Sequence, residues 1–412
     1  MNETPTLAST HPTEAASLAS WAQNVKRSPL QEMLFAAAKP GIISFAMGLP
    51  APELFPVEEL IRASGHVLAN DSRALQYGPP FQPLKSQVVE LMAKRKVACC
   101  EEQVFITTGA QQGMSLLVRL LLEPRGRVLT EQLIYPGFQQ VIEPYEPEVI
   151  SVAIDARTGI DVAAVASLLA SGAQPAFIYA ISSGHNPVGV SLTEAKRLRL
   201  VDLARQYRIP IIEDDPYGFL DYGRETLPPL RAYDDQWVFY VGSFSKILTP
   251  ALRVGWLVVP ENLIPKLSVV KEASDIDTNT FAQRLISRLL EQEEIDRRLS
   301  MLRDEYRARR DTMAQALRES FPMAAKWVTP DHGFFFWVEL PHGVDTLGLL
   351  AKALEKERVA FIPGQAFSVD PSSGATNCMR LNFSHSNPNL IREGIARLGE
   401  LVREALNRNI VD

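Results

Sequence analysis

The chain has 412 residues, 46% of them hydrophobic and 22% charged, and 42 basic against 48 acidic side chains give a formal charge of −6. The length predicts roughly two to three domains with sizeable cores. The acidic balance argues against nucleic acid as a partner. Cys99, Cys100 and Cys378 are too few for a disulfide framework and lack the spacing of a zinc site. We therefore expect no metal and a reducing, cytoplasmic environment.

Membrane association is not expected either. The longest apolar stretch, residues 116–122, contains Arg119 and is well short of the ~20 apolar residues of a membrane helix. Residues 1–20 have neither the basic start nor the apolar run of a secretory signal, and their acidic residues and lack of arginine differ from a transit peptide. We interpret residues 1–28 as an N-terminal arm.

Short apolar runs alternate with amphipathic helical patterns from about residue 104 onwards. The runs of strand length are VFITTG (104–109), RVLTEQ (127–132), VISVAI (149–154), AFIYAISS (176–183), IPIIEDD (209–215), VFYVGSF (238–244) and VGWLVVP (254–260). Most are rich in Val, Ile and Phe and lack polar alternation, as strands buried on both faces do. This pattern predicts an α/β fold with a mainly parallel sheet between helices. In the helix expected over residues 191–208, Ser191 is the predicted N-cap, with Glu194 completing a capping box.

The pattern changes after about residue 286. A long charged helical run covers residues 291–320. The elements that follow are the strand-like FFFWVEL (334–340), VAFIPG (359–364) and MRLNFS (379–384) and a final helix over residues 391–406. They predict a smaller α+β domain. The three prolines of GLPAPELFP (48–56) predict an extended linker.

The motif GSFSKILTPALRVGW (242–256) is the strongest chemical signal. Lys246 follows a predicted strand, Ser243 and Ser245 precede it at alternate positions, and Arg253 lies seven residues on. A buried lysine is costly as an ammonium ion but is tolerated when it forms a Schiff base. Two hydroxyls and an arginine can together bind a phosphate. On this motif alone, a surface lysine in a serine-rich turn is an equal alternative.

A second motif, IIEDDPYG (211–218), places Asp214 at the end of a strand and Tyr217 three residues later. Asp214 could keep the nitrogen of a pyridine cofactor protonated, and Tyr217 could hydrogen-bond the phenolic oxygen of the ring. A helix N-cap beside a packed tyrosine would give the same pattern.

Three further motifs carry weaker signals. The strand-to-helix turn TTGAQQGM (107–114) offers backbone N–H groups to an anion, as any such turn does. GHNPVG (184–189) is first of all a turn, although its Asn186 amide could reach a cofactor oxygen. Arg380 lies within an apolar strand and needs a partner, which is either a substrate carboxylate or a structural acid.

Taken together and in this order, the motifs resemble the fold-type-I pyridoxal-phosphate aminotransferases of the class I/II group. Within that group the chain is most similar to the 2-aminoadipate/aromatic, multi-substrate branch, from about residue 29 to the C-terminus. The motifs that carry the resemblance are ISFAMGLPAPELFP, LQYGPP, TTGAQQGM, YPG, HNPVG, EDDPY, GSFSKILTPALRVGW and MRLNFS.

The resemblance implies a large domain with a seven-stranded, mainly parallel sheet between helices, and a smaller α+β domain. We expect an arm at 1–28, a segment and linker joining the small domain at 29–56, a large cofactor-binding domain at 57–295 and a small C-terminal domain at 296–412. The implied activity is pyridoxal-phosphate-dependent transfer of an amino group from an L-amino acid to a 2-oxo acid by a ping-pong mechanism.

The resemblance also implies roles for residues around the cofactor ring. Lys246 would form the Schiff base and carry a proton between the substrate Cα and the cofactor. Asp214 would pair with the pyridine nitrogen, while Tyr217 and Asn186 would bond the phenolic oxygen. Tyr135, in YPG, would stack on the ring, and an ordinary loop aromatic is the alternative.

Other residues are implied for the phosphate, the substrate and a second subunit. The phosphate would be held by Ala110, Gln111, Ser243, Ser245 and Arg253. Arg380 would hold the substrate α-carboxylate, helped by Asn186 and the backbone near Gly48. Tyr77, in LQYGPP, would reach the phosphate of the neighbouring subunit, which implies an obligate homodimer with shared active sites.

The chain departs from the branch near the expected substrate side chain. Met47, His185 and His332 replace a glycine, a glutamine and a glycine of the branch. Gln31 aligns with an arginine that aminoadipate enzymes use on an acidic side chain. We therefore expect a neutral, aromatic or otherwise unusual amino donor to be preferred over 2-aminoadipate. The two histidines are each either packed or pocket residues.

Two alternatives to transamination stay open. The altered pocket, to which Phe334 and Phe335 add apolar surface, leaves room for elimination, cyclisation or decarboxylation with the same cofactor. The second alternative is the effector domain of a transcription regulator, in which such a domain follows a DNA-binding winged helix. Residues 1–28 are not basic and show no helix-turn-helix pattern, so we disfavour it.

Overall fold

A seven-stranded sheet lies at the centre of the computed structural model, which describes residues 17–23, 39–223, 226–291, 294–370 and 374–409. The strand order is β2 (Val104–Thr107), β10 (Gly255–Val258), β9 (Val238–Ser243), β8 (Ile211–Asp214), β7 (Ile178–Ala180), β3 (Arg127–Glu131) and β4 (Glu148–Val152). β10 is antiparallel to both neighbours, and every other pair is parallel. The predicted strands and mainly parallel sheet are confirmed.

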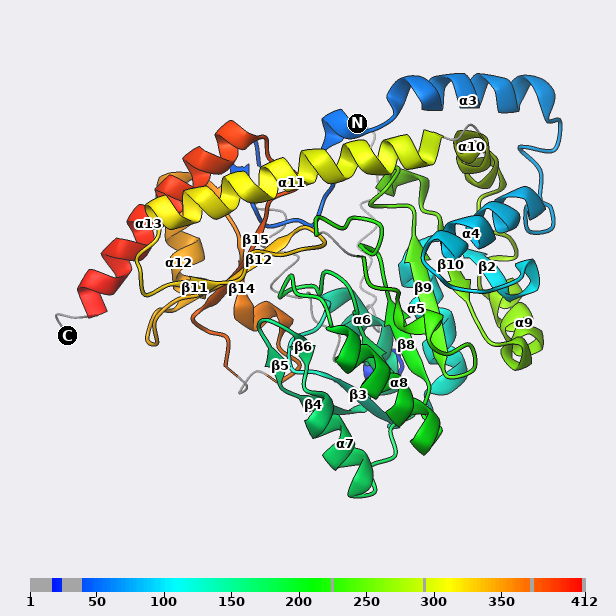
Figure 1. The fold of residues 1–412 in the computed structure, drawn as a ribbon, viewed down its shortest axis with the longest axis horizontal. Coiled ribbons are helices and arrows are strands. Elements are labelled where there is room, and N and C mark those ends of the chain that lie inside the picture. The colour runs from blue at the N-terminus through cyan, green and yellow to red at the C-terminus, as the bar shows by residue number, and fades with distance from the viewer. Residues whose placement is uncertain (1–16, 24–38, 224–225, 292–293, 371–373, 410–412) are drawn as a thin grey trace, which may run out of the picture.

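Helices cover both faces of this sheet, which explains why its strands are apolar throughout (Figure 1). One face packs against α5 (Gly109–Leu121), α6 (Pro136–Ile142) and α9 (Ile264–Asp275), and the other against α4 (Gln82–Lys94), α7 (Val162–Ala170) and α8 (Glu194–Tyr207). Successive residues of β8 belong to opposite faces, with Ile211 packed beneath α7 and α8 and Ile212 beneath α5.

The parallel strands end at a common edge, and the chemical motifs stand there. β8 ends at Asp214, β9 ends at Ser243, and the HNPVG turn follows β7. α5 begins at Gly109 directly after β2, which runs in the same direction as β9 because β10 is antiparallel to both. The fold thus brings motifs that are far apart in the sequence to one edge of the sheet.

A second sheet lies beside the first and has four antiparallel strands (Figure 1). Their order is β11 (Lys326–Trp327), β12 (Phe335–Glu339), β15 (Cys378–Asn382) and β14 (Ile362–Pro363). The long helix α11 (Glu294–Ser320) contacts both α10 (Thr280–Leu290) and α13 (Pro388–Asn409), so it spans the two parts of the molecule. Within this sheet, Trp337 of β12 pairs with Arg380 of β15.

Shorter elements connect these layers. The remaining strands are β1 (Ile43–Ser44), β5 (Ile154–Asp155), β6 (Gly159–Ile160) and β13 (Val359–Ala360), and the remaining α-helices are α1 (Ser20–Gln23), α3 (Val57–Asn70) and α12 (Thr346–Lys352). Short 3₁₀ helices cover Pro52–Leu54, Glu101–Gln103, Glu143–Tyr145, Leu230–Ala232, Pro250–Leu252, Glu261–Leu263 and Gly364–Phe367, and a π-helical turn covers Ala353–Glu357. β1 pairs in parallel with β13. None of the helices in the described ranges is long and apolar enough to cross a membrane.

Two local predictions are wrong. Helix α8 begins at Glu194 and is capped by the Thr193 side chain, which accepts a backbone N–H of the first turn, so Ser191 is not its N-cap. Ser191 Oγ instead accepts from the Gly184 N–H and serves the neighbouring loop. The proline-rich segment 48–56 is not wholly extended, because Pro52–Leu54 forms a 3₁₀ turn.

Candidate active site

A cavity of about 390 Å³ lies between the C-terminal ends of β8 and β9 and the strands β12 and β15. Every site residue predicted from the sequence lines this cavity except Tyr77, whose side chain is 78% exposed. The cavity therefore gathers the motifs of the large sheet, the Met47–Gly48 backbone and Arg380 of the second sheet in one place. No group of three or more His, Cys, Asp or Glu residues in the described part of the chain is arranged to hold a metal ion.

Lys246 follows β9 and points into the cavity. Its Nζ donates to the Gly48 carbonyl oxygen at 2.8 Å. Burial and, after it, the cationic Arg253 and Arg380 together lower the lysine pKa to about 8, while Asp214 acts in the opposite direction. A lysine held in this way loses its proton near neutral pH and becomes a nucleophile.

Asp214, the last residue of β8, is fully buried and presents one oxygen to the cavity. Its Oδ2 accepts from the Tyr179 hydroxyl at 2.8 Å, whereas no described residue donates to Oδ1. Burial and, to a smaller extent, the neighbouring Asp215 raise the pKa of Asp214 to about 7, against the opposing hydrogen bond from Tyr179. A buried carboxylate oxygen without a protein partner is well placed to accept from a ligand N–H.

An anion cradle is formed where α5 begins. Gly109 adopts a φ of +73°, and a Cβ there would stand 2.5 Å from Nη2 of Arg253, so only glycine lets the guanidinium lie against the start of the helix. Ser243 and Ser245 line the same end of the cavity, and Ser243 Oγ accepts from the Ser245 N–H. Helix N–H groups, hydroxyls and an arginine together suit a phosphate.

Arg380 reaches the cavity from β15, and its guanidinium contacts two aromatic rings and two hydrogen-bond acceptors. Its guanidinium lies between the rings of Phe335 and Phe367, 4.1 and 4.7 Å from their centres. Nη1 donates to Asn186 Oδ1 at 2.6 Å and Nη2 to the Ala46 carbonyl, while Nε has no acceptor among the described residues. Burial lowers the arginine pKa to about 10, yet the group stays cationic at neutral pH and can bind a carboxylate.

Two tyrosines complete the cavity wall. The Tyr135 ring folds over Gly137, where an added Cβ would stand 2.4 Å from the ring carbons. Tyr217 is buried against Phe334 and Phe335, with ring centres 5.2 and 5.9 Å away. Burial raises the pKa of both phenols, so both remain protonated at neutral pH and can donate hydrogen bonds.

Both histidines that depart from the related branch are packed residues and do not line the cavity. His185 Nε2 lies 2.9 Å from a Glu131 carboxylate oxygen. His332 contacts Ser191 at 3.1 Å and Asp221 at 3.7 Å, and burial lowers its pKa to about 4. The pocket interpretation of these two residues is therefore wrong.

The remaining pocket residues expected from the sequence differ in whether they line the cavity. Met47 and Phe335 line the cavity as expected. Phe334 does not, because it packs behind the wall against Tyr217 and Tyr306. Gln31 lies outside the described residues.

Sequence reasoning missed several contributors to the site. Tyr179 supports Asp214 from the neighbouring strand, and Phe367 covers one face of Arg380. Met114 and Gln140 add to the cavity wall from α5 and α6. The apolar sequence around Tyr179 gives no sign of its partner, because the pairing depends on β7 lying beside β8.

Comparison with known proteins decides the family. The model of a family described as aminotransferase class I and II matches residues 41–398. The chain belongs to the class I and II aminotransferases. An aromatic-amino-acid aminotransferase 1 from Thermococcus litoralis is 37% identical to it over 396 residues, which cover 94% of each chain.

Solved structures agree with this membership. A multiple substrate aminotransferase from Thermococcus profundus is similar with a TM-score of 0.88 and 35% identity, covering 95% of this chain and 98% of that one. An alpha-aminoadipate aminotransferase from Thermus thermophilus, complexed with N-(5'-phosphopyridoxyl)-L-leucine, is similar with a TM-score of 0.87 and 34% identity, covering 95% and 98%. This chain is thus a pyridoxal-phosphate-dependent aminotransferase of fold type I, as its sequence motifs indicate.

The cavity of this aminotransferase fits the cofactor of its family. Asp214 Oδ1 offers an acceptor for a protonated ring nitrogen, and the cradle around Gly109 and Arg253 offers donors for a phosphate. Lys246 lines the same cavity with a pKa suited to attack on an aldehyde. The three features match the ring nitrogen, the phosphate and the aldehyde of pyridoxal phosphate.

In the cofactor-free aminotransferase, Lys246 should react as an amine whose pKa is about 8, so about half of it is uncharged at pH 8. Competitive acetylation from neutral to alkaline pH, read by mass spectrometry of the Lys246 peptide, should give a reactivity midpoint near pH 8. The exposed Lys266 serves as internal control for reagent decay. A Lys246 midpoint above about pH 10, as for a lysine in water, would contradict this expectation.

Proposed function

We propose that this enzyme carries pyridoxal phosphate on Lys246 and moves an amino group from an L-amino acid to a 2-oxo acid by a ping-pong mechanism. One observation carries the proposal: a buried lysine amine, the Asp214 Oδ1 acceptor and an anion cradle face the same cavity. Together they suit the aldehyde, the ring nitrogen and the phosphate of a single cofactor molecule.

When bound, pyridoxal phosphate supplies a ring that withdraws electrons from the substrate Cα. Asp214 sustains this property by keeping a proton on the ring nitrogen. The positive nitrogen in turn favours the ionised carboxylate, and Tyr179 holds Oδ2 in place. Tyr217 and Asn186, which line the cavity, would donate to the phenolic oxygen, and Tyr135 would cover the ring face.

Lys246 Nζ would take the Cα proton of the amino donor and deliver it to the cofactor, and in the second half-reaction it would carry a proton from the cofactor to the Cα of the oxo acceptor. The Gly48 carbonyl, which accepts from Nζ at 2.8 Å, keeps the amine inside the cavity between these transfers. A pKa of about 8 suits both directions, because the amine can accept and release a proton near neutral pH.

Arg380 binds the α-carboxylate that amino donor and oxo acceptor share. Two aromatic rings fix the plane of its guanidinium, and Asn186 and the Ala46 carbonyl fix its rotation. Because donor and acceptor present the same carboxylate at the same place, one arginine serves both half-reactions in turn.

Replacing Lys246 with alanine should abolish covalent cofactor attachment and amino transfer, because no other amine faces the lining that the structure describes. Borohydride reduction followed by peptide mapping should place the pyridoxyl group on Lys246 of the unsubstituted enzyme and on no lysine of the variant. Lys266→Ala, at an exposed position, is the matched control and should keep both properties. Pyridoxyl label on another lysine would refute the assignment.

The proposal includes a homodimer with shared active sites. Tyr77 lies between α3 and α4, outside its own cavity. The stretch of chain that leads to Tyr77 carries exposed large apolar side chains, namely Val57, Ile61 and Leu68 of α3, and Leu75. An apolar surface of this kind typically marks a protein interface. We therefore assign Tyr77 to the phosphate end of the partner's cavity, as the related enzymes imply.

Ile61→Asp and Leu75→Asp together should weaken the dimer and reduce activity in parallel, because they place charges on the apolar surface around Tyr77. Sedimentation velocity measures the oligomeric state, and activity is assayed at the same protein concentrations. Met323→Asp is the control, since Met323 is also fully exposed but lies outside this surface. An unsubstituted enzyme that is a fully active monomer would overturn the proposal.

We further propose that the enzyme prefers amino donors with neutral or aromatic side chains. Among the described residues that line the cavity, the cations are Lys246, Arg253 and Arg380, and each has a role toward the cofactor or the α-carboxylate. Met47 and Phe335 contribute apolar surface near Arg380. A distal carboxylate on the donor therefore meets no described cation of its own.

Phenylalanine, leucine and methionine should each give a higher kcat/KM than 2-aminoadipate, with 2-oxoglutarate or pyruvate as acceptor. Met47→Arg should raise the kcat/KM for 2-aminoadipate relative to leucine because it adds a cation to the apolar wall, whereas Met47→Leu should not. A clear preference of the unsubstituted enzyme for 2-aminoadipate would contradict the assignment.

A further inference from the structure

Three consecutive carboxylates, Glu213, Asp214 and Asp215, stand at the end of β8, and all are buried, with 0%, 3% and 1% of their surface exposed. Asp214 lines the cavity, whereas its two neighbours belong to the opposite face, as alternation along a strand requires. Like charges this close in a medium of low dielectric constant oppose each other's ionisation. Residues on the sheet face opposite the cavity must therefore stabilise the charges of Glu213 and Asp215.

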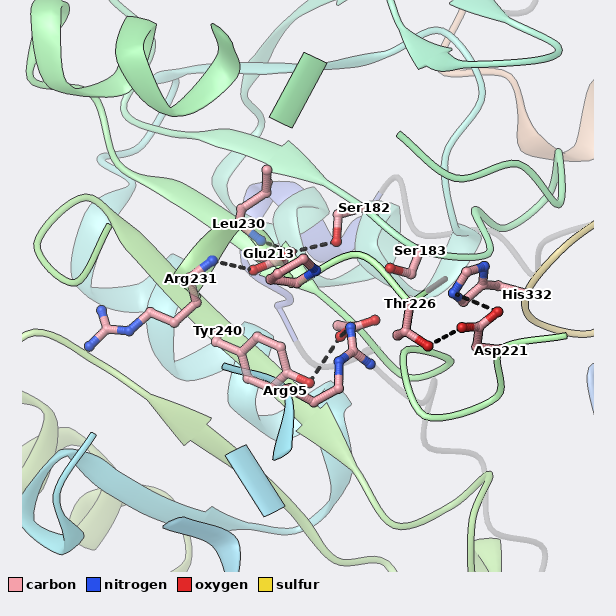
Figure 2. Close-up of polar contacts among 12 residues, drawn as sticks. Arg95, Ser182, Ser183, Glu213, Asp221, Thr226, Leu230, Arg231, Tyr240 and His332 are labelled. Atoms are coloured by element: carbon pink, nitrogen blue, oxygen red, sulfur yellow. Dashed lines mark hydrogen bonds and ion pairs between the residues drawn. The ribbon is translucent and has the colours of Figure 1, made fainter. Parts of the chain in front are cut away.

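The Glu213 carboxylate is held by hydrogen bonds. It accepts from the Ser182 hydroxyl and from the backbone N–H groups of Leu230 at 2.7 Å and Arg231 at 2.9 Å (Figure 2). The Arg231 guanidinium points away from it and donates to backbone carbonyls. Within the described part of the chain, Glu213 forms hydrogen bonds but no direct ion pair, and the cationic Arg197 acts on it electrostatically.

Asp215 is compensated by a cation from another element. Nη2 of Arg95, at the C-terminal end of α4, lies 3.2 Å from Asp215 Oδ2, and the Tyr240 hydroxyl donates to the same oxygen at 3.0 Å. Both members of the ion pair are almost fully buried, and Arg95 and Tyr240 lie together behind β8 (Figure 2).

The ion pair also lies directly beneath the EDDPYG turn. A Cβ on Gly218 would stand 2.0 Å from Nη1 of Arg95 and 2.2 Å from Oδ2 of Asp215. Glycine at this position therefore lets the pair approach the backbone that carries Tyr217. Asp215 directly follows Asp214 in the chain, and the pair lies against Gly218, which directly follows Tyr217, although neither Arg95 nor Asp215 lines the cavity.

We propose that Arg95 and Asp215 are positioning residues for the cofactor: Arg95 neutralises Asp215, so that the adjacent Asp214 stays ionised and keeps the proton of the ring nitrogen in place. This inference rests on the proposed role of Asp214. The pair acts through charge and through the turn, without contact to the cofactor.

Charge and packing roles predict different outcomes for substitutions. Loss of Arg95 leaves the Asp215 charge unbalanced and drives the proton from the ring nitrogen toward Asp214. Loss of Asp215 leaves the Arg95 charge unbalanced and holds Asp214 more firmly ionised. Other titratable groups around Asp214 are Tyr135, Tyr179, His185, Tyr217 and Lys246, and those around Asp215 are Glu213, Arg197, Tyr240 and His332. None of these groups is substituted in any of the variants, so they do not account for a difference between them.

The test uses the holoenzyme loaded with pyridoxal phosphate that carries ¹⁵N in the ring. The ¹⁵N chemical shift reports protonation of the ring nitrogen, and the dissociation constant of the cofactor is measured separately. Arg95→Met should move the shift toward unprotonated pyridine and weaken cofactor binding about tenfold, which corresponds to one pKa unit. Asp215→Asn should keep the pyridinium shift, and Arg95→Lys should restore it.

The double variant Arg95→Met/Asp215→Asn removes both charges and should behave like the unsubstituted enzyme, so it carries the test if Arg95→Met alone does not fold. An Arg95→Met enzyme with an unchanged shift and unchanged affinity would overturn the inference while leaving the proposed function intact. Equal loss of affinity in both single variants, with no change in the shift, would also overturn it, because that is a packing effect. An unprotonated ring nitrogen in the unsubstituted enzyme would remove the role of Asp214 itself.

Discussion

A carboxylate that must stay charged away from water is the constraint around which the catalytic edge of this aminotransferase is organised. Burial raises the pKa of Asp214 to about 7, so its environment has to favour the anion by other means. Tyr179 donates from the neighbouring strand, and Lys246 and His185 contribute favourable charge from the cavity side and the following loop. The sheet thus supports one acidic side chain from several elements.

The substrate side of the cavity depends on a contact between the two sheets. Arg380 comes from the centre of the second sheet, while Asn186 comes from the loop after β7 of the first, and their hydrogen bond of 2.6 Å joins them. The backbone at Ala46 and Gly48 completes the junction by accepting from Arg380 and Lys246. The positions of Arg380 and Lys246 therefore rely on the same short backbone segment.

The sequence predicts the large sheet from local pattern, because continuous apolar runs identify its strands. It predicts the cavity lining chiefly through the resemblance of its motifs to the class I and II aminotransferases, and several of these motifs follow strands that finish at the common edge. The contributions of Tyr179, Phe367 and Arg95 could not be predicted, since they depend on which strands and helices become neighbours. The packing of His185 against Glu131 could not be predicted from the sequence for the same reason. Ser191 and Thr193 are both suitable N-cap residues by type, and only the structure shows that the helix begins after Thr193.

Gly184 and Gly333 bring two backbone segments into close approach. Gly184 precedes the loop of Asn186, Gly333 precedes β12, and both adopt positive φ angles, 62° and 71°. A Cβ on Gly184 would stand 2.9 Å from the Gly333 nitrogen, and a Cβ on Gly333 would stand 3.1 Å from the Gly184 oxygen. A side chain at either position would therefore require the two backbones to separate, and with them the loop that carries Asn186 and the start of β12.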